Sequence, residues 1–237
     1  MAKQPARVET FGLPPVPPWL RNILVALVAL YLVEVAAANL FGTAFYVVLA
    51  WYDPIAMPWQ VVTRYFVQGL GSQPVMRLLF DLLLIYFLAP QVVSSFDLRQ
   101  RMQVLAAAVV GGTVVAGLLG AVGFASAPAM GWHGLSVALI TLFGLSNPEG
   151  VIRWNFVFPI PGKVIAWGTG AVNALILLGD HSMMAADDFG VWVGVMVWWF
   201  LVGPGARRRQ LVGKGKKLER DLRNLQVLPG GRDETFH

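Results

Sequence analysis

Long apolar runs alternate with short polar breaks along most of the chain. A helix needs about 20 apolar residues to cross the hydrocarbon core of a bilayer, and several of the runs reach this length. The candidate spans are residues 19–40, 75–95, 102–124, a shorter run from Gly134 to just before Asn147, 162–178 and 185–202. The short fourth run fits a helix whose outer end lies below the membrane surface. We therefore predict an all-α, polytopic membrane protein with six transmembrane helices.

The segment 41–72, between the first two spans, has a different pattern. It is apolar and rich in aromatic residues, but Asp53, Pro54, Pro58 and two glycines interrupt it. Aromatic side chains at this density suit the membrane–water interface. We therefore do not predict a clean span here.

Small residues recur at every fourth position of the third span, at Ala108, Gly112, Ala116 and Gly120. This spacing places them on one helix face and lets a neighbouring backbone approach closely. Gly190 and Gly194 have the same spacing in the sixth span, and we predict that they also serve close helix packing.

Composition agrees with a membrane domain that carries short tails. Hydrophobic residues make up 57% of the 237 residues and charged residues only 13%, too few for a soluble surface. We predict an N-terminal tail at 1–18, one membrane domain at 19–203 and a basic tail at 204–237. The first residues are polar and proline-rich, unlike a cleavable signal peptide. Because cysteine is absent, disulfides and thiol chemistry are excluded.

Basic residues are distributed unevenly about the predicted spans. With six spans and both termini in the cytoplasm, 16 of the 18 basic residues face the cytoplasm, and only Arg64 and Arg77 fall near the outer face. The positive-inside rule favours this orientation over one with five or seven spans. We expect a bacterial inner-membrane protein with both termini cytoplasmic.

The basic tail beside the last span has two interpretations. It can simply fix the topology, or it can contact anionic lipid headgroups. The residues concerned are Arg207, Arg208, Arg209, Lys214, Lys216 and Lys217. A nucleic-acid partner is not expected, because this charge lies beside the membrane.

Several ionisable residues lie inside predicted spans, where each costs about 2.5–3.5 kcal/mol on the insertion scale. They are Glu34, Arg77, Asp81, Asp187 and Asp188. Arg77 and Asp81 are four residues apart and share a helix face, so they can pair. Either these charges neutralise one another and fix helix packing, or they line a polar cavity that binds something.

The chain carries five motif-like stretches in order: WQVVTRYFVQ (59–68), RLLFD (77–81), GLSV (134–137), RWNFVFPIPGK (153–163) and ADDFGVWVG (186–194). Together they resemble the rhomboid family of intramembrane serine proteases. Residues 59–68 (WQVVTRYFVQ) are similar to the loop-one signature ending in Phe-x-His. Residues 77–81 (RLLFD) are similar to His-x-x-Phe-Asn on span two, and 134–137 (GLSV) to Gly-x-Ser-Gly at the start of span four. Residues 153–163 (RWNFVFPIPGK) look like a stretch found before span five, and 186–194 (ADDFGVWVG) look like Ala-His-x-x-Gly-x-x-x-Gly on span six.

The resemblance implies a six-helix rhomboid bundle in which the segment 41–72 is a membrane-embedded loop. The residues needed for proteolysis, however, are replaced. Ser136 keeps the nucleophile position, while Asp187 stands where the family has the dyad histidine. Arg77 and Asp81 stand at the two oxyanion-side positions. In an alternative register, Gly131-Trp132-His133-Gly134 matches the serine motif and puts His133 in place of the nucleophile; the sequence leaves the register open. The neighbouring Gln68, His133 and Gly134 are implied binding positions.

These replacements argue against peptide cleavage. A serine hydroxyl is a weak nucleophile until a base takes its proton. A carboxylate with a pKa near 4 matches this task poorly, and losing the base of a serine protease costs on the order of 10⁶ in rate. The ionised Asp81 offers no donor to an oxyanion, although Arg77 can donate. Ser136 also has a simpler interpretation, as a helix cap or a hydroxyl bonded to its own helix.

The sequence leaves three functions open. The first is a proteolytically inactive rhomboid relative, similar in fold to derlins, that binds transmembrane clients. The second is an intramembrane serine protease that uses Ser136 with a non-standard base. The third is a small-molecule binder or transporter that uses the cluster of Arg77, Asp81 and Asp187. The lack of a paired half-repeat in the sequence disfavours this third function. No cofactor is expected, and the three histidines show no metal-ligand spacing.

The rhomboid arrangement also implies a specific contact. Span two and the starts of spans four and six would surround one cavity, so that Arg77, Ser136 and Asp187 converge. We expect an Arg77–Asp187 pair that joins spans two and six, with Asp81 sharing the guanidinium.

Overall fold

A computed structural model describes residues 16–42, 48–51, 57–69, 74–124, 128–154, 158–206, 211, 214–215 and 217–219. Most of the N-terminal tail, parts of the segment 41–72 and most of the basic tail lie outside these residues. The predicted lipid contacts of Arg207, Arg208, Arg209 and Lys216 therefore fall outside the described part of the chain.

Six apolar helices follow one another at the predicted positions. They are α1 (Pro18–Phe41), α4 (Pro74–Ser94), α5 (Leu98–Ala121), α6 (His133–Ser146), α7 (Gly162–Asp180) and α8 (Met183–Leu201). Five of them are long and apolar enough to cross a membrane, which makes this an all-α, multi-pass membrane protein. The exception is α6, whose 14 residues extend about 21 Å. A count of six crossings stays a prediction.

Local chemistry sets several helix ends. Pro18 occupies the first turn of α1, where its missing N–H has no helical partner to lose. The Asp97 carboxylate accepts from the Gln100 N–H at 2.7 Å, while the Gln100 side chain accepts from the Asp97 N–H at 3.2 Å, and this capping box starts α5. The Ser182 hydroxyl accepts from the Ala185 N–H and starts α8.

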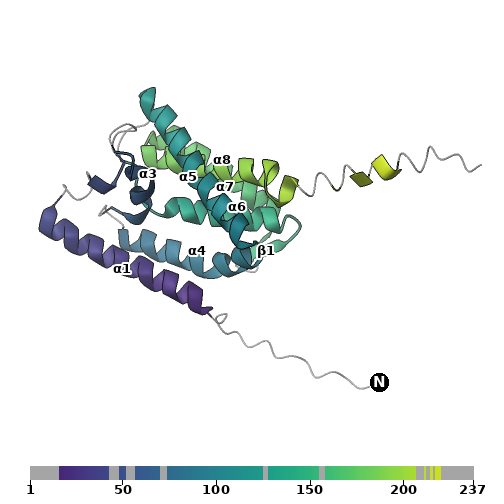
Figure 1. The fold of residues 1–237 in the computed structure, drawn as a ribbon, viewed down its shortest axis with the longest axis horizontal. Helices are drawn as coiled ribbons and strands as arrows, with labels where there is room; N and C mark the ends of the chain where they lie inside the picture. Colours follow the sequence, from purple (N-terminus) through teal and green to yellow (C-terminus); the bar gives the residue numbers. More distant parts are fainter. Residues whose placement is uncertain are drawn as a thin grey trace, which may run out of the picture.

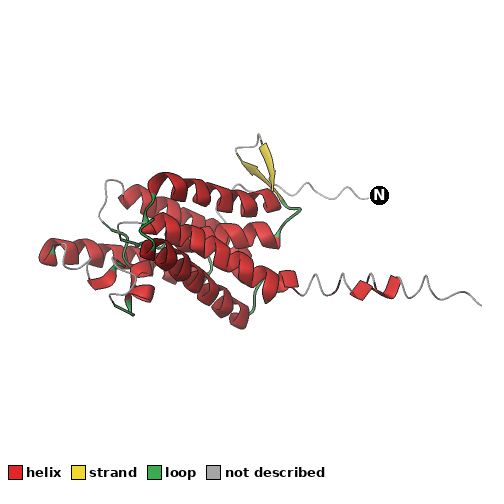
Figure 2. Cartoon of the chain, turned by 90° about the horizontal axis from the view of Figure 1, so that it is seen from above, coloured by secondary structure: helices red, strands yellow, loops and turns green. Residues whose placement is uncertain are grey.

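The short α6 is the central helix of the bundle. It packs against α4, α5, α7 and α8, and most of its residues are buried. The most extensive helix pair is α5 with α8, whereas α1 lies at the periphery and packs against α4 (Figure 1). Figure 2 shows the helical bundle from above, with a two-stranded hairpin projecting from its edge. A helix surrounded on all sides is apolar all round, as the α6 sequence is.

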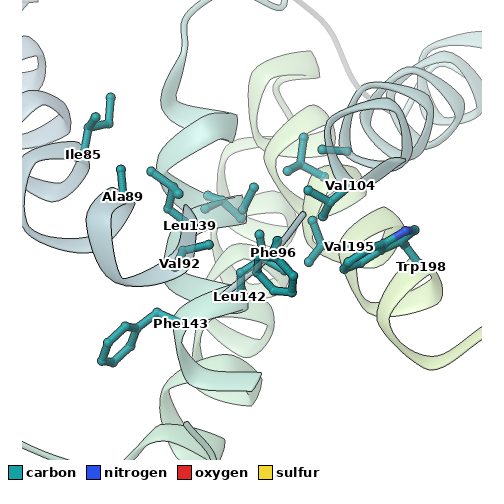
Figure 3. Packing of buried hydrophobic residues seen from close by; sticks show 14 of the residues in the cluster. Ile85, Ala89, Val92, Phe96, Val104, Leu139, Leu142, Phe143, Val195 and Trp198 are labelled. Atoms are coloured by element: carbon teal, nitrogen blue, oxygen red, sulfur yellow. The ribbon is translucent and has the colours of Figure 1, made fainter. Parts of the chain in front are cut away.

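An apolar core fills one end of the bundle. It includes Ile85, Ala89 and Val92 of α4, Leu139 and Leu142 of α6, and Val195 and Trp198 of α8 (Figure 3). Leu20, near the start of α1, belongs to the same core as Trp198, near the end of α8. The first helix therefore begins and the last helix ends at the same end of the bundle (Figure 1).

Two features were not predicted from the sequence. Strands β1 (Val151–Trp154) and β2 (Phe158–Pro161) form an antiparallel hairpin before α7, with Val151 opposite Pro161. The segment 41–72 contributes the short helices α3 (Gln60–Thr63) and η1 (Arg64–Phe66). Trp51 in this segment pairs with Ala129 through reciprocal backbone hydrogen bonds of 3.1 and 2.9 Å.

Candidate functional site

The buried charged side chains gather at the end of the bundle away from the apolar core. α4, α6 and α8 begin at this end, and α1 and α5 finish there. The alternating direction of successive helices thus brings together residues far apart in sequence. They form two hydrogen-bonded groups, one around Asp187 and one around Asp81, with Glu34 joining the segment 41–72 to α1.

Asp187 forms an ion pair with Arg64 of η1. The distance between Arg64 Nη2 and Asp187 Oδ1 is 2.7 Å, and the Arg64 side chain is completely buried. The Tyr65 hydroxyl also donates to Asp187 Oδ1, at 3.1 Å.

Aromatic rings and a glycine enclose this ion pair. The Arg64 guanidinium lies 4.4 Å from the ring centroid of Trp51 and 4.7 Å from that of Tyr65, which are cation–π contacts. A Cβ atom at Gly112 of α5 would lie 2.1 Å from Asp187 Oδ1 and 2.8 Å from the Tyr65 hydroxyl. Only glycine therefore leaves room for the carboxylate between α5 and η1.

The expected Arg77–Asp187 pair is not formed. Arg77 donates from Nη1 to the Met184 sulfur at 3.0 Å, and Asp187 takes Arg64 instead. Arg64 comes close because η1 places its side chain between Thr113 of α5 and Asp187 of α8, a position that the sequence pattern does not reveal. The expected contact between Asp81 and the Arg77 guanidinium is also not formed. Asp81 contacts Ser136 and His133 of α6 instead.

Asp81 holds the start of α6 through one oxygen. Its Oδ1 accepts from the Ser136 hydroxyl at 2.7 Å and lies 3.1 Å from His133 Nδ1. Ser136 is fully buried and Asp81 nearly so. On the other side of the imidazole ring, His133 Nε2 is 4.0 Å from Asp188 Oδ2. The group therefore links α4, α6 and α8.

This arrangement contains the three residue types of a catalytic triad in a different order. In a triad the serine hydroxyl donates to histidine, and the carboxylate binds the far side of that histidine. Here one carboxylate oxygen of Asp81 accepts the hydrogen bond of the Ser136 hydroxyl and also contacts the imidazole of His133. A hydroxyl that donates to a carboxylate gains a strong hydrogen bond, but it has no neutral base to take its proton.

Glu34 fastens the segment 41–72 to the peripheral helix α1. Its two carboxylate oxygens accept from the backbone N–H groups of Gln68 and Gly69, at 2.8 and 2.7 Å. Gly69 has a φ of +77°, a conformation that side chains disfavour. The buried charge predicted in the first span is thus matched by two backbone donors.

The remaining predicted positions lie around these groups. Gln68 is buried, and Gly134 lies so that a Cβ atom there would be 3.1 Å from the Val191 side chain. Gly190 and Gly194 pack on the backbone of α5, because Cβ atoms at these positions would lie 2.5 Å from the Gly111 carbonyl oxygen and 2.1 Å from the Ala107 carbonyl oxygen.

Sequence reasoning missed Arg64, Tyr65 and Thr113 as members of the site. Thr113 accepts from Arg64 Nη2 at 3.1 Å. The available signal was the charge count, because Arg64 and Arg77 are the two basic residues placed at this end. That count could not decide which arginine meets Asp187.

Comparison with known proteins adds no relative. No protein-family model matches the chain, and no curated protein matches it significantly.

Proposed function

We propose that the protein is a rhomboid-like membrane protein without protease activity that binds transmembrane clients. The support comes from the order of apolar helices, the five motif-like stretches and the hydrogen bonding of the polar residues. Clients would meet the bundle laterally within the bilayer, where its outer helices carry exposed apolar side chains.

One observation carries the inactive assignment: the Ser136 hydroxyl donates to Asp81. The carboxylate at the dyad position, Asp187, is occupied by Arg64. Each of the two groups is therefore used to join helices. A site built for acyl transfer needs a hydroxyl next to a base and donors aimed at an oxyanion.

The test uses purified protein reconstituted with a model transmembrane substrate that bears a photo-crosslinker. We expect a crosslinked complex and an intact substrate, both unchanged in Ser136→Ala. Cleavage that disappears in Ser136→Ala would overturn the inactive assignment. Absence of a crosslinked complex over a panel of such substrates would overturn client binding.

A second candidate, a serine protease with a non-standard base, is favoured by the convergence of Ser136, His133 and Asp81. A modest movement of the His133 ring toward Ser136 would be required. This candidate expects labelling of Ser136 by a fluorophosphonate probe, lost in both Ser136→Ala and His133→Ala. The non-proteolytic proposal expects no serine-dependent labelling.

A further inference from the structure

Gln68 is a buried amide whose hydrogen-bonding capacity is unused. The side chain is 6% exposed, and neither its Nε2 nor its Oε1 has a hydrogen-bond partner among the described residues. A buried polar group without a partner costs about 1–3 kcal/mol. Glu34 holds the Gln68 backbone N–H, so the residue cannot easily turn away to relieve this cost.

Arg77 lies next to this amide and is an incompletely satisfied cation. A Cβ atom at Gly131 would be 3.2 Å from Gln68 Oε1 and 3.7 Å from Arg77 Nη2, so both side chains converge on the same backbone position. The one hydrogen bond found for the Arg77 guanidinium within the described ranges goes to a thioether, a weak acceptor. No carboxylate of the described residues lies within 4.0 Å of it.

The other ionisable groups at this end are already engaged. Asp187 forms an ion pair with Arg64. Asp81 accepts a hydrogen bond from Ser136 and contacts His133, and Glu34 accepts hydrogen bonds from two backbone N–H groups. Asp188 lies 4.0 Å from His133 and also interacts electrostatically with Arg77, although no ion pair within 4.0 Å joins Asp188 to that guanidinium. Arg64 Nε, Arg64 Nη1 and Asp81 Oδ2 are also buried without a partner, but other atoms of those side chains are held by an ion pair or hydrogen bonds. Arg77 and Gln68 differ because neither side chain has a nitrogen or oxygen partner among the described residues.

We infer that Arg77 and Gln68 bind a carboxylate side chain, an Asp or Glu within the transmembrane helix of a client. The inference rests on the proposed client binding and specifies the client's chemistry. A guanidinium binds a carboxylate through two parallel N–H donors. The Gln68 amide supplies a third donor once it is flipped, so that Nε2 replaces Oε1 on the side of Arg77. The pairing offsets two costs at once, because a lone acid in a client helix is as expensive in the bilayer as the unpaired Arg77.

A protein carboxylate fits this position better than a lipid phosphate. Gln68 is almost fully buried beneath the turn at Gly131, and Arg77 is half-buried. A side-chain carboxylate is small and flat, whereas a phosphodiester is tetrahedral and tied to two bulky groups at the membrane surface.

The experiment measures binding of a synthetic leucine–alanine transmembrane helix to the full-length protein in phosphatidylcholine vesicles, by energy transfer between fluorophores. The helix carries one Glu in its outer third, and a matched helix carries Gln. We expect the wild type to prefer the Glu helix about tenfold, equal to about 1.4 kcal/mol. Arg77→Gln and Gln68→Leu should each reduce this preference, while Arg21→Gln, the same substitution at an exposed arginine of α1, should leave it unchanged.

The outcomes separate this inference from the proposed function. Equal binding of the Glu and Gln helices would overturn the carboxylate site and leave client binding standing. Equal preference in wild type and Arg77→Gln would also overturn it, and circular dichroism shows whether the variant is folded. If phosphatidylglycerol in the vesicles abolishes the Glu preference, the site belongs to a lipid phosphate and the inference is wrong. A preference for a Lys helix in Arg77→Glu would support direct pairing.

Discussion

A single nitrogen of Arg64, Nη2, donates hydrogen bonds to three oxygen atoms, those of Asp187, the Tyr65 hydroxyl and the Thr113 hydroxyl. A charge at this depth is tolerated when its partners are fixed in place. The rings of Trp51 and Tyr65 supply further attraction. The consequence is that one side chain fastens the segment 41–72 to both α5 and α8.

A double-mutant cycle tests this ion pair. Arg64→Met and Asp187→Leu should each lower the free energy of unfolding by about 3–5 kcal/mol, because each strands a buried charge. The double variant should lose clearly less than the sum of the two, measured by thermal unfolding in detergent. The matched cycle of Arg77→Met with Asp187→Leu should be additive. Additivity in the Arg64 cycle would contradict direct coupling.

Ser136 is expected to matter for stability and not for catalysis. Ser136→Ala removes one of the two groups bound to Asp81 Oδ1, and a hydrogen bond to a charged group contributes about 1.5–3 kcal/mol. We expect a loss of that size in the free energy of unfolding. Thr141→Val is the control, since Thr141 is equally buried but bonds only to a carbonyl of its own helix. Equal losses in both variants would argue against a special Ser136–Asp81 bond.

At the scale of elements, hydropathy placed all six apolar helices because each must meet lipid or a neighbouring helix with apolar atoms. The sequence pattern also predicted that α1, α4 and α8 carry buried charges. It did not predict which residues these charges contact. Asp187 pairs with Arg64 across 123 positions of sequence, and only the folding of the segment 41–72 decides that choice. The β1–β2 hairpin was also missed, because its residues fall in the stretch before span five, for which no secondary structure was predicted.

The tight contact between α5 and α8 depends on glycine. A Cβ atom at Gly194 would lie 2.1 Å from the Ala107 carbonyl oxygen, so the two backbones must separate if one is added. Gly194→Ala should therefore lower the free energy of unfolding by about 1–3 kcal/mol, measured by thermal unfolding in detergent. Gly168→Ala in α7 is the control. Nothing lies within 4 Å of its added Cβ, and it should be neutral or stabilising by up to about 1 kcal/mol. Similar losses for both would show that the loss at Gly194 does not come from its contact with α5.

At the scale of the whole molecule, helix α1 begins and helix α8 ends at the same end of the bundle. Leu20 of α1 packs in the same core as Trp198 of α8, and the polar groups occupy the opposite end. This arrangement separates the half with the largest apolar cluster, which sets the packing of α4, α6 and α8, from a polar half. In the polar half, Arg64 and Asp81 join the helices beside two smaller apolar clusters. Both proposals concern the polar half, so its position relative to the membrane decides which part of a client it can meet.

Membrane orientation can be measured without interference, because the chain has no cysteine. Of the 18 basic residues, 16 fall on the side of the predicted cytoplasmic termini. Single cysteines at Ser95, between α4 and α5, and at His237 should therefore resist a membrane-impermeant maleimide in intact cells and react after lysis. A cysteine at Val122, an exposed position at the end of α5, should react in intact cells. Ser95 and Val122 lie at opposite ends of one helix, so each is the other's control. Labelling of Ser95→Cys with protection of Val122→Cys would invert the topology and place Arg77 and Gln68 on the cytoplasmic side.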